Sequence, residues 1–143
     1  MYADEVYEAV AAAIEGIQLP VTAKAHTGDR FVRLPPGSLS FPGERAFVLE
    51  GGVPSEHADM VLLDQDNMVV GLQLGVGYLS GSEASTKRAL RDTHLILGAL
   101  LALEAVDGSQ IAHVQVQGQA FLYQAKILEV SYLISVRYDP RTP

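Results

Sequence analysis

Residues 68–79, MVVGLQLGVGYL, and residues 80–103, SGSEASTKRALRDTHLILGALLAL, decide the fold of this chain. Apolar side chains in the first stretch recur at every second position, which is the period of a strand with one buried face. They are Val70, Leu72, Leu74, Val76 and Tyr78. Apolar side chains in the second stretch recur at three- and four-residue steps, which is the period of an amphipathic helix. A long strand that leads directly into a long helix is therefore predicted.

The long helix is expected to begin at Ser80, because Ser80 and Glu83 have the spacing of a capping box. The stripe expected to face the sheet consists of Thr86, Ala89, Leu90, Thr93, Ile96, Leu97, Leu100, Leu101 and Leu103. The opposite side begins with basic residues and continues with the apolar or small residues Leu95, Gly98, Ala99 and Ala102. A helix that is apolar on both sides is expected to make contacts on both, so these four residues form a candidate subunit interface. An ordinary exposed face is the alternative, because alanine favours helix anywhere.

The rest of the chain adds a second helix, a loop and further strands. Residues 3–17 have the pattern of a short amphipathic helix, and residues 21–43 form a long loop rich in proline and glycine around an extended piece at 31–34. Further strands are predicted at 45–50, 59–63, 111–117 and 126–138, with 59–63 and 68–79 joined as a hairpin.

This order predicts a single α+β domain over residues 1–143, with the hairpin, helix and two-strand core at 45–138. Its mainly antiparallel sheet is expected to carry the long helix and the shorter N-terminal helix on one face. The other face of the sheet is polar but uncharged, and its residues are Gln73, His113, Gln115, Gln117, Ser131 and Ser135. Such a face suits hydrogen bonding to a partner or exposure at a ring lumen, but an ordinary solvated sheet face has the same pattern.

Composition excludes several classes of function. The net charge of −7 argues against a broad nucleic-acid-binding surface, and the absence of cysteine excludes disulfides and thiolate metal sites. No apolar run approaches the roughly 18 residues of a membrane helix, and the acidic start differs from a signal peptide, so no membrane association is expected. Charged residues make up 19% of the chain, below the roughly 25% usual for soluble domains. This deficit indicates surface reserved for neighbouring subunits.

Motifs that would carry chemistry are incomplete. GVGYLSG at 75–81 has Ser80 where a dinucleotide-binding turn needs glycine or alanine. The aspartates before Met68 are not followed by the ligand and glycine of a calcium loop. Ser80 and Ser82 lack the G-x-S-x-G context, and the four histidines share no metal-ligand spacing. We therefore expect no catalytic residue, no metal and no cofactor, and a chain that is not an enzyme.

The order of elements resembles that of the tail-terminator, or tail-completion, proteins of long-tailed bacteriophages and related gene-transfer particles. The resemblance covers residues 2–139 by layout and rests mainly on residues 68–139. Within that part the long strand leads into the helix ending LILGALLALEAVDG, followed by the strands IAHVQVQG and ILEVSYLISVRYD. The family has no invariant catalytic signature, so the similarity is one of arrangement.

The resemblance implies a structural virion protein that forms a homohexameric ring at the head-proximal end of the tail tube. It would stop tube polymerisation and join the head, after assembly in the host cytoplasm. Its partners would be other copies of itself, the tail-tube protein and a head-completion or connector protein, with DNA only as passing cargo. A ring requires contacts between two different patches, and Arg30, Arg33 and Arg45 are expected to pair with acids on a neighbour.

Two alternatives stay open at this point. The chain is also compatible with another head–tail connector or neck protein of the same kind of particle. A small ligand-binding α+β domain or enzyme is the other alternative, with its site between the 21–43 loop and the 50–59 segment.

Overall fold

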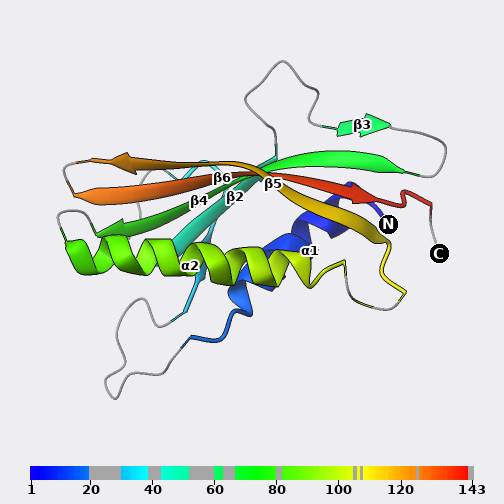
Figure 1. The fold of residues 1–143 in the computed structure, drawn as a ribbon. Helices are drawn as coiled ribbons and strands as arrows, with labels where there is room; N and C mark the ends of the chain where they lie inside the picture. The colour runs from blue at the N-terminus through cyan, green and yellow to red at the C-terminus, as the bar shows by residue number, and fades with distance from the viewer. Residues whose placement is uncertain are drawn as a thin grey trace.

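The computed structural model describes residues 1–19, 30–38, 43–51, 60–62, 67–79, 82–104, 106, 108–124 and 126–141. Its elements are, in chain order, α1 (Ala3–Glu15), β1 (Val32–Leu34), β2 (Ala46–Gly51), β3 (Met60–Leu62), β4 (Met68–Leu79), α2 (Glu83–Leu101), β5 (Ile111–Tyr123) and β6 (Ile127–Tyr138). The architecture is α+β with a mainly antiparallel sheet and two helices, as the sequence predicts (Figure 1). Much of the expected 21–43 loop, and most of the 50–59 segment, lie outside the described residues.

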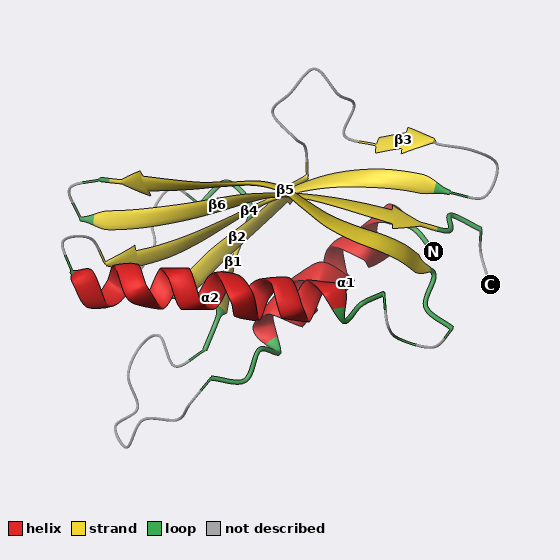
Figure 2. Cartoon of the chain, in the orientation of Figure 1, coloured by secondary structure: helices red, strands yellow, loops and turns green. Residues whose placement is uncertain are grey.

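The sheet has the strand order β1-β2-β4-β6-β5, and β3 pairs with the beginning of β4. Among the described strands, β1 and β2 run parallel and the other neighbours run antiparallel. The longest pairing joins β4 to β6, from Met68 opposite Tyr138 to Leu79 opposite Ile127. Figure 2 shows α1 and α2 on the same side of the sheet. Among the described residues, the other face of the sheet carries no helix and is called the helix-free face below.

The core lies between the sheet and the two helices. The alternating apolar residues of β4 are buried there, and so are those of β6: Leu128, Val130, Tyr132, Ile134, Val136 and Tyr138. Helix α1 adds Val6, Val10, Ala11 and Ile14. The strand predicted at 68–79 is thus confirmed with its bounds and its buried face.

Strand β5 is longer than the sequence predicts. The prediction ended it at Gln117 and treated the following residues as a connector, whereas the structure continues β5 to Tyr123. Its pairing with β6 shifts between Ile111 and His113, and again between Val116 and Gly118. Each shift inserts an extra residue and breaks the two-residue alternation, so the pattern on which the prediction relied does not extend through the whole strand.

Helix α2 buries only part of the predicted stripe: Ala89, Ile96 and Leu100 are confirmed in the core. It begins at Glu83, and the side chain of Ser82 caps it by accepting a hydrogen bond from the Ser85 nitrogen at 3.3 Å. Ser80 lies outside the described residues. The buried residues are Ser85, Ala89, Asp92, Ile96 and Leu100, whereas Leu90 and Leu101 are 53% and 51% exposed. The core assignment of these two leucines was wrong because two polar residues, Ser85 and Asp92, face inward.

Candidate functional site

A buried carboxylate, Asp92, joins α2 to the start of β2. Asp92 is fully buried, and its Oδ2 accepts hydrogen bonds from Arg45 Nε and from the Tyr78 hydroxyl, both at 2.8 Å. Its Oδ1 accepts a further bond from Arg45 Nη2 at 2.9 Å. Burial, with the neighbouring Asp92 charge, raises the pKa of Tyr78 above its usual value, so the phenol keeps the proton that it donates. The bidentate pair and the tyrosine together satisfy both carboxylate oxygens.

Arg45 is held in an unusual backbone conformation. Its φ of 64° lies in the left-handed region, which costs a residue with a side chain about 1–3 kcal/mol. Its nitrogen donates to the Gly77 oxygen at 2.8 Å, and its oxygen accepts from the Val32 nitrogen at 3.1 Å. Its guanidinium also lies 5.7 Å from the centre of the Phe31 ring, a cation–π distance. These contacts offset the backbone cost and fix the arginine in place.

Glu44, the preceding residue, makes a second connection to α2. The Ser85 hydroxyl donates to Glu44 Oε1 at 2.5 Å, and Arg88 forms an ion pair with the same carboxylate. Two adjacent residues of opposite charge thus bind successive turns of α2: Glu44 binds Ser85 and Arg88, and Arg45 binds Asp92. Sequence analysis missed Glu44, Tyr78 and Asp92 as a cluster, because they come from three separate segments. The one available signal was the 85–89–92–96–100 spacing, which is helical when polar residues are allowed on the buried face.

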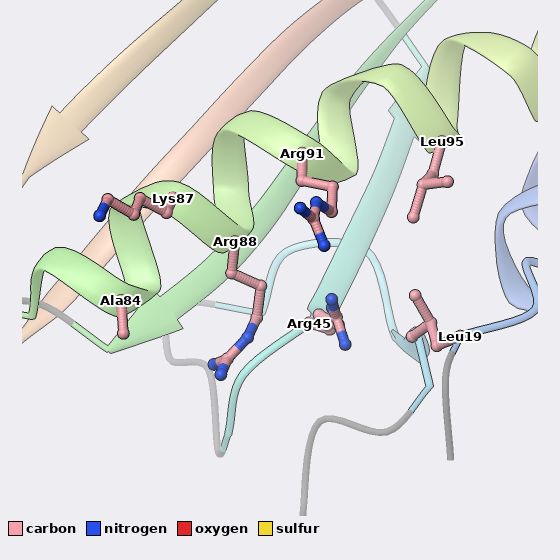
Figure 3. Close-up of a pocket in the computed structure, with 7 residues that line it drawn as sticks. All are labelled: Leu19, Arg45, Ala84, Lys87, Arg88, Arg91 and Leu95. Carbon is pink, nitrogen blue, oxygen red and sulfur yellow. The ribbon is translucent and has the colours of Figure 1, made fainter. Parts of the chain in front are cut away.

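A basic groove of about 380 Å³ lies beside the first half of α2. It is lined by Leu19, Arg45, Ala84, Lys87, Arg88, Arg91 and Leu95 (Figure 3). In Figure 3, Arg88 and Arg91 point from α2 toward the space beside Arg45, and Leu19 lies opposite Leu95. Four of its seven lining residues are basic although the chain has a net charge of −7. The groove is therefore a local concentration of positive charge with an apolar end.

The cations of the groove differ in how they are paired. Arg45 and Arg88 form ion pairs with Asp92 and Glu44, and Lys87 forms an exposed pair with Glu83 at 3.2 Å. Exposed pairs of this kind contribute little, because water competes for both charges. Arg91 is exposed and makes no hydrogen bond or ion pair with any residue that the structure describes. Arg91 and Lys87 are thus the cations most accessible to an anionic partner.

The groove is suited to binding. Its side chains are arginine, lysine, leucine and alanine. Guanidinium and ammonium groups attract and orient carboxylates or phosphates by charge and hydrogen bonds. In the described ranges, no group of three or more histidine, aspartate or glutamate residues is placed to hold a metal ion.

The four helix residues assigned to an interface do not share one environment. Leu95 is half-buried in the groove and Ala99 is also half-buried, whereas Gly98 and Ala102 are exposed. A side chain built at Gly98 would meet no atom within 4 Å. The accessible part of this predicted interface therefore consists of Gly98 and Ala102.

The three arginines predicted to lie at an interface also lie in different environments. Arg30 is exposed. Arg33 donates to Glu8 at 3.0 Å and forms an ion pair with Glu15, so it fastens β1 to α1. For Arg33 and Arg45, acids of their own chain supply the pairing that was expected from a neighbour.

The polar residues of the sheet lie on its helix-free face. Gln115 is opposite Ser135, and the Gln117 side chain, at the bulge, donates to the Ser135 hydroxyl. His113 is opposite Arg137, and its Nδ1 lies 3.0 Å from Glu104. Gln73 and Ser131 are half-buried, and Gln73 lines a small cavity of about 70 Å³.

Charged residues also belong to this face, contrary to the uncharged surface expected from the sequence. Glu50 and Glu129 line the same small cavity as Gln73, and Arg137 is exposed at the end of β6. A side chain at Gly75 would come within 2.9 Å of Glu129 Oε1, so this glycine makes room for the carboxylate. Glycine inside a strand allows such a close approach because it has no side chain.

In the described part of the chain, neither helix is long and apolar enough to cross a bilayer. No protein-family model matches the sequence, and no curated protein matches it either.

Proposed function

We propose that this chain is a structural virion protein that assembles side by side into a ring and caps the head-proximal end of a phage tail tube. In this role it stops tube growth and presents a surface to the head-completion protein. The observation that supports the proposal is the placement of exposed large apolar side chains at two opposite ends of the molecule.

The first apolar end lies where β4 and β5 finish. Leu79, Leu122 and Tyr123 are each more than half exposed. Leu79 is opposite Ile127, and Tyr123 is opposite Leu128, so all three lie near the beginning of β6. Solvent-exposed apolar groups of this size, clustered at one end, are typical of contact surfaces.

The second apolar end lies where α1 begins and α2 finishes. Tyr2 and Leu101 are more than half exposed there. The nitrogen of Met1 donates to the Arg141 oxygen at 2.8 Å, which places Tyr2 close to the end of β6. Glu104, just after α2, binds the Val114 nitrogen in the first half of β5. Figure 1 shows this end of the sheet opposite the turn between β5 and β6.

Two different apolar ends favour heterologous association, in which one end of a subunit contacts the other end of the next subunit. A ring forms when one patch of each subunit meets a different patch of the next and the rotation closes. A two-fold dimer would instead need one self-complementary patch. The position of the two patches at opposite ends therefore supports the ring in preference to an isolated dimer.

Light scattering and native mass spectrometry of the purified protein, with and without the tail-tube protein, test the proposal. We expect a closed oligomer alone or on the tube, visible as a ring by negative-stain electron microscopy. A protein that stays monomeric at high concentration and also fails to bind the tube would refute the proposal. Labelled protein found only on tail-less heads would identify a head–tail connector instead.

A further inference from the structure

We infer that the basic groove beside α2 receives the acidic first turn of α1 from a second copy of this chain. The inference rests on the proposed ring and specifies the polar part of the contact between successive subunits.

The groove offers accessible positive charge next to an apolar wall. Lys87 and Arg91 are exposed on α2, while Leu19 and Leu95 line the other end of the same cavity. Arg45, held by Asp92, supplies a fixed part of the lining (Figure 3). An occupant that fits must therefore present carboxylates and a neighbouring apolar group.

The start of α1 presents this combination. Asp4 and Glu5 lie in its first turn and are exposed. Neither forms an ion pair with any other residue in the described ranges, whereas Glu8 and Glu15 are occupied by Arg33. Tyr2, exposed directly before them, supplies the apolar group.

The two surfaces are placed so that they cannot meet within one molecule. Figure 1 shows α1 beginning beside the chain's N-terminus, at the end of the sheet opposite the start of α2. The groove lies along the first half of α2. A contact between these surfaces must therefore join two copies, and repetition of the contact produces a ring or an open chain.

A second copy fits the groove better than nucleic acid does. A nucleic acid needs cations along many successive phosphates, whereas the groove offers two accessible ones, Lys87 and Arg91, which match the two carboxylates of one helix turn. Binding of a single-stranded oligonucleotide that is abolished by Arg91→Glu, without any effect of that substitution on self-association, would overturn the inference.

Cross-linking tests the contact directly, because the chain has no cysteine of its own. The double variant Glu5→Cys/Arg91→Cys is oxidised with and without tail-tube protein, and we expect a ladder of covalent oligomers beyond the dimer. Each single-cysteine variant can give at most a dimer. The pair Glu5→Cys/Gln115→Cys is the matched control, since Gln115 is exposed on the helix-free face. Equal ladders from both pairs, or none from either, would overturn the inference.

Charge reversal provides a second readout. Arg91→Glu and Glu5→Lys should each weaken self-association about tenfold, and the combined variant should recover to within about twofold, because the pair is restored with reversed polarity. Arg137→Glu is the charge-matched control, exposed on the far face of the sheet, and should change the dissociation constant less than about twofold.

The two proposals can fail separately. If a ring forms but residues 5 and 91 do not cross-link, the groove assignment is wrong and the capping function stands. If neither cross-links nor a ring appear and the tail-tube protein is not bound, both proposals are wrong.

Discussion

Replacing Asp92 with asparagine is expected to lower the free energy of unfolding by about 3 kcal/mol. The carboxylate accepts three hydrogen bonds, from Arg45 Nε, Arg45 Nη2 and the Tyr78 hydroxyl. Asparagine keeps one acceptor oxygen and turns a donor toward these donors. Removing one partner of a buried ion pair costs about 3–5 kcal/mol, because the other charge stays buried. The Arg45 side chain is 12% exposed, so limited access of water places the expected cost at the lower end.

Urea denaturation followed by far-UV circular dichroism measures this loss. With a slope of about 1–3 kcal/mol per molar urea, the midpoint should fall by about 1–3 M at an unchanged slope. Glu8→Gln is the matched control, since it removes an acid from the exposed pair with Arg33 and should cost less than about 1 kcal/mol. If the two variants lose equal stability, the Asp92 pair is not the buried connection that the structure indicates.

Three further predictions concern pH, packing and assembly. The pKa of Tyr78 is raised above the value of about 10 that it has in the unfolded chain, so the contribution of its protonated hydroxyl to the free energy of unfolding is complete below pH 10 and is lost as the pH rises further. Urea denaturation at about pH 9 and about pH 11 measures this loss, and equal free energies of unfolding at the two pH values would contradict the prediction. Gly75→Ala should cost at most about 0.5–1 kcal/mol in thermal unfolding, because the Glu129 carboxylate is the end of a flexible side chain and can move away, and should become neutral or stabilising in a Glu129→Ala background. Leu122→Ser should reduce the assembly measured by light scattering without lowering the melting temperature, whereas Val32→Ser, exposed on β1, should leave assembly intact. If both substitutions have equal effects, the apolar end at Leu122 is not part of the interface.

Local periodicity predicted those elements in which one face is uniformly apolar. Strand β4 was predicted with its bounds, because its buried residues alternate without interruption. Strand β5 was cut short, because two bulges break the alternation that a sequence pattern can detect. The buried face of α2 was predicted only in part, because Ser85 and Asp92 are buried through partners that lie elsewhere in the chain.

The groove was beyond prediction for a related reason. Arg91 and Leu95 are neighbours on one helix, and their basic and apolar character was evident from the sequence. Leu19 and Arg45 reach the same cavity only through the packing of α1 and β2, and the left-handed conformation of Arg45 has no sequence signal in a residue other than glycine, asparagine or aspartate. The tertiary fold was needed to bring these side chains together.

The position of β6 has a consequence for how the protein is made. β6 is synthesised after β4 and β5, yet it lies between them and pairs with both along nearly its whole length. Until residues 127–138 leave the ribosome, one edge of the apolar 12-residue strand β4 therefore has unpaired backbone N–H and C=O groups, because its partner strand has not been made. Chains stopped at residue 125 should be insoluble or rapidly degraded, which pelleting and pulse–chase labelling would measure. Only chains that include β6 would thus be available for assembly.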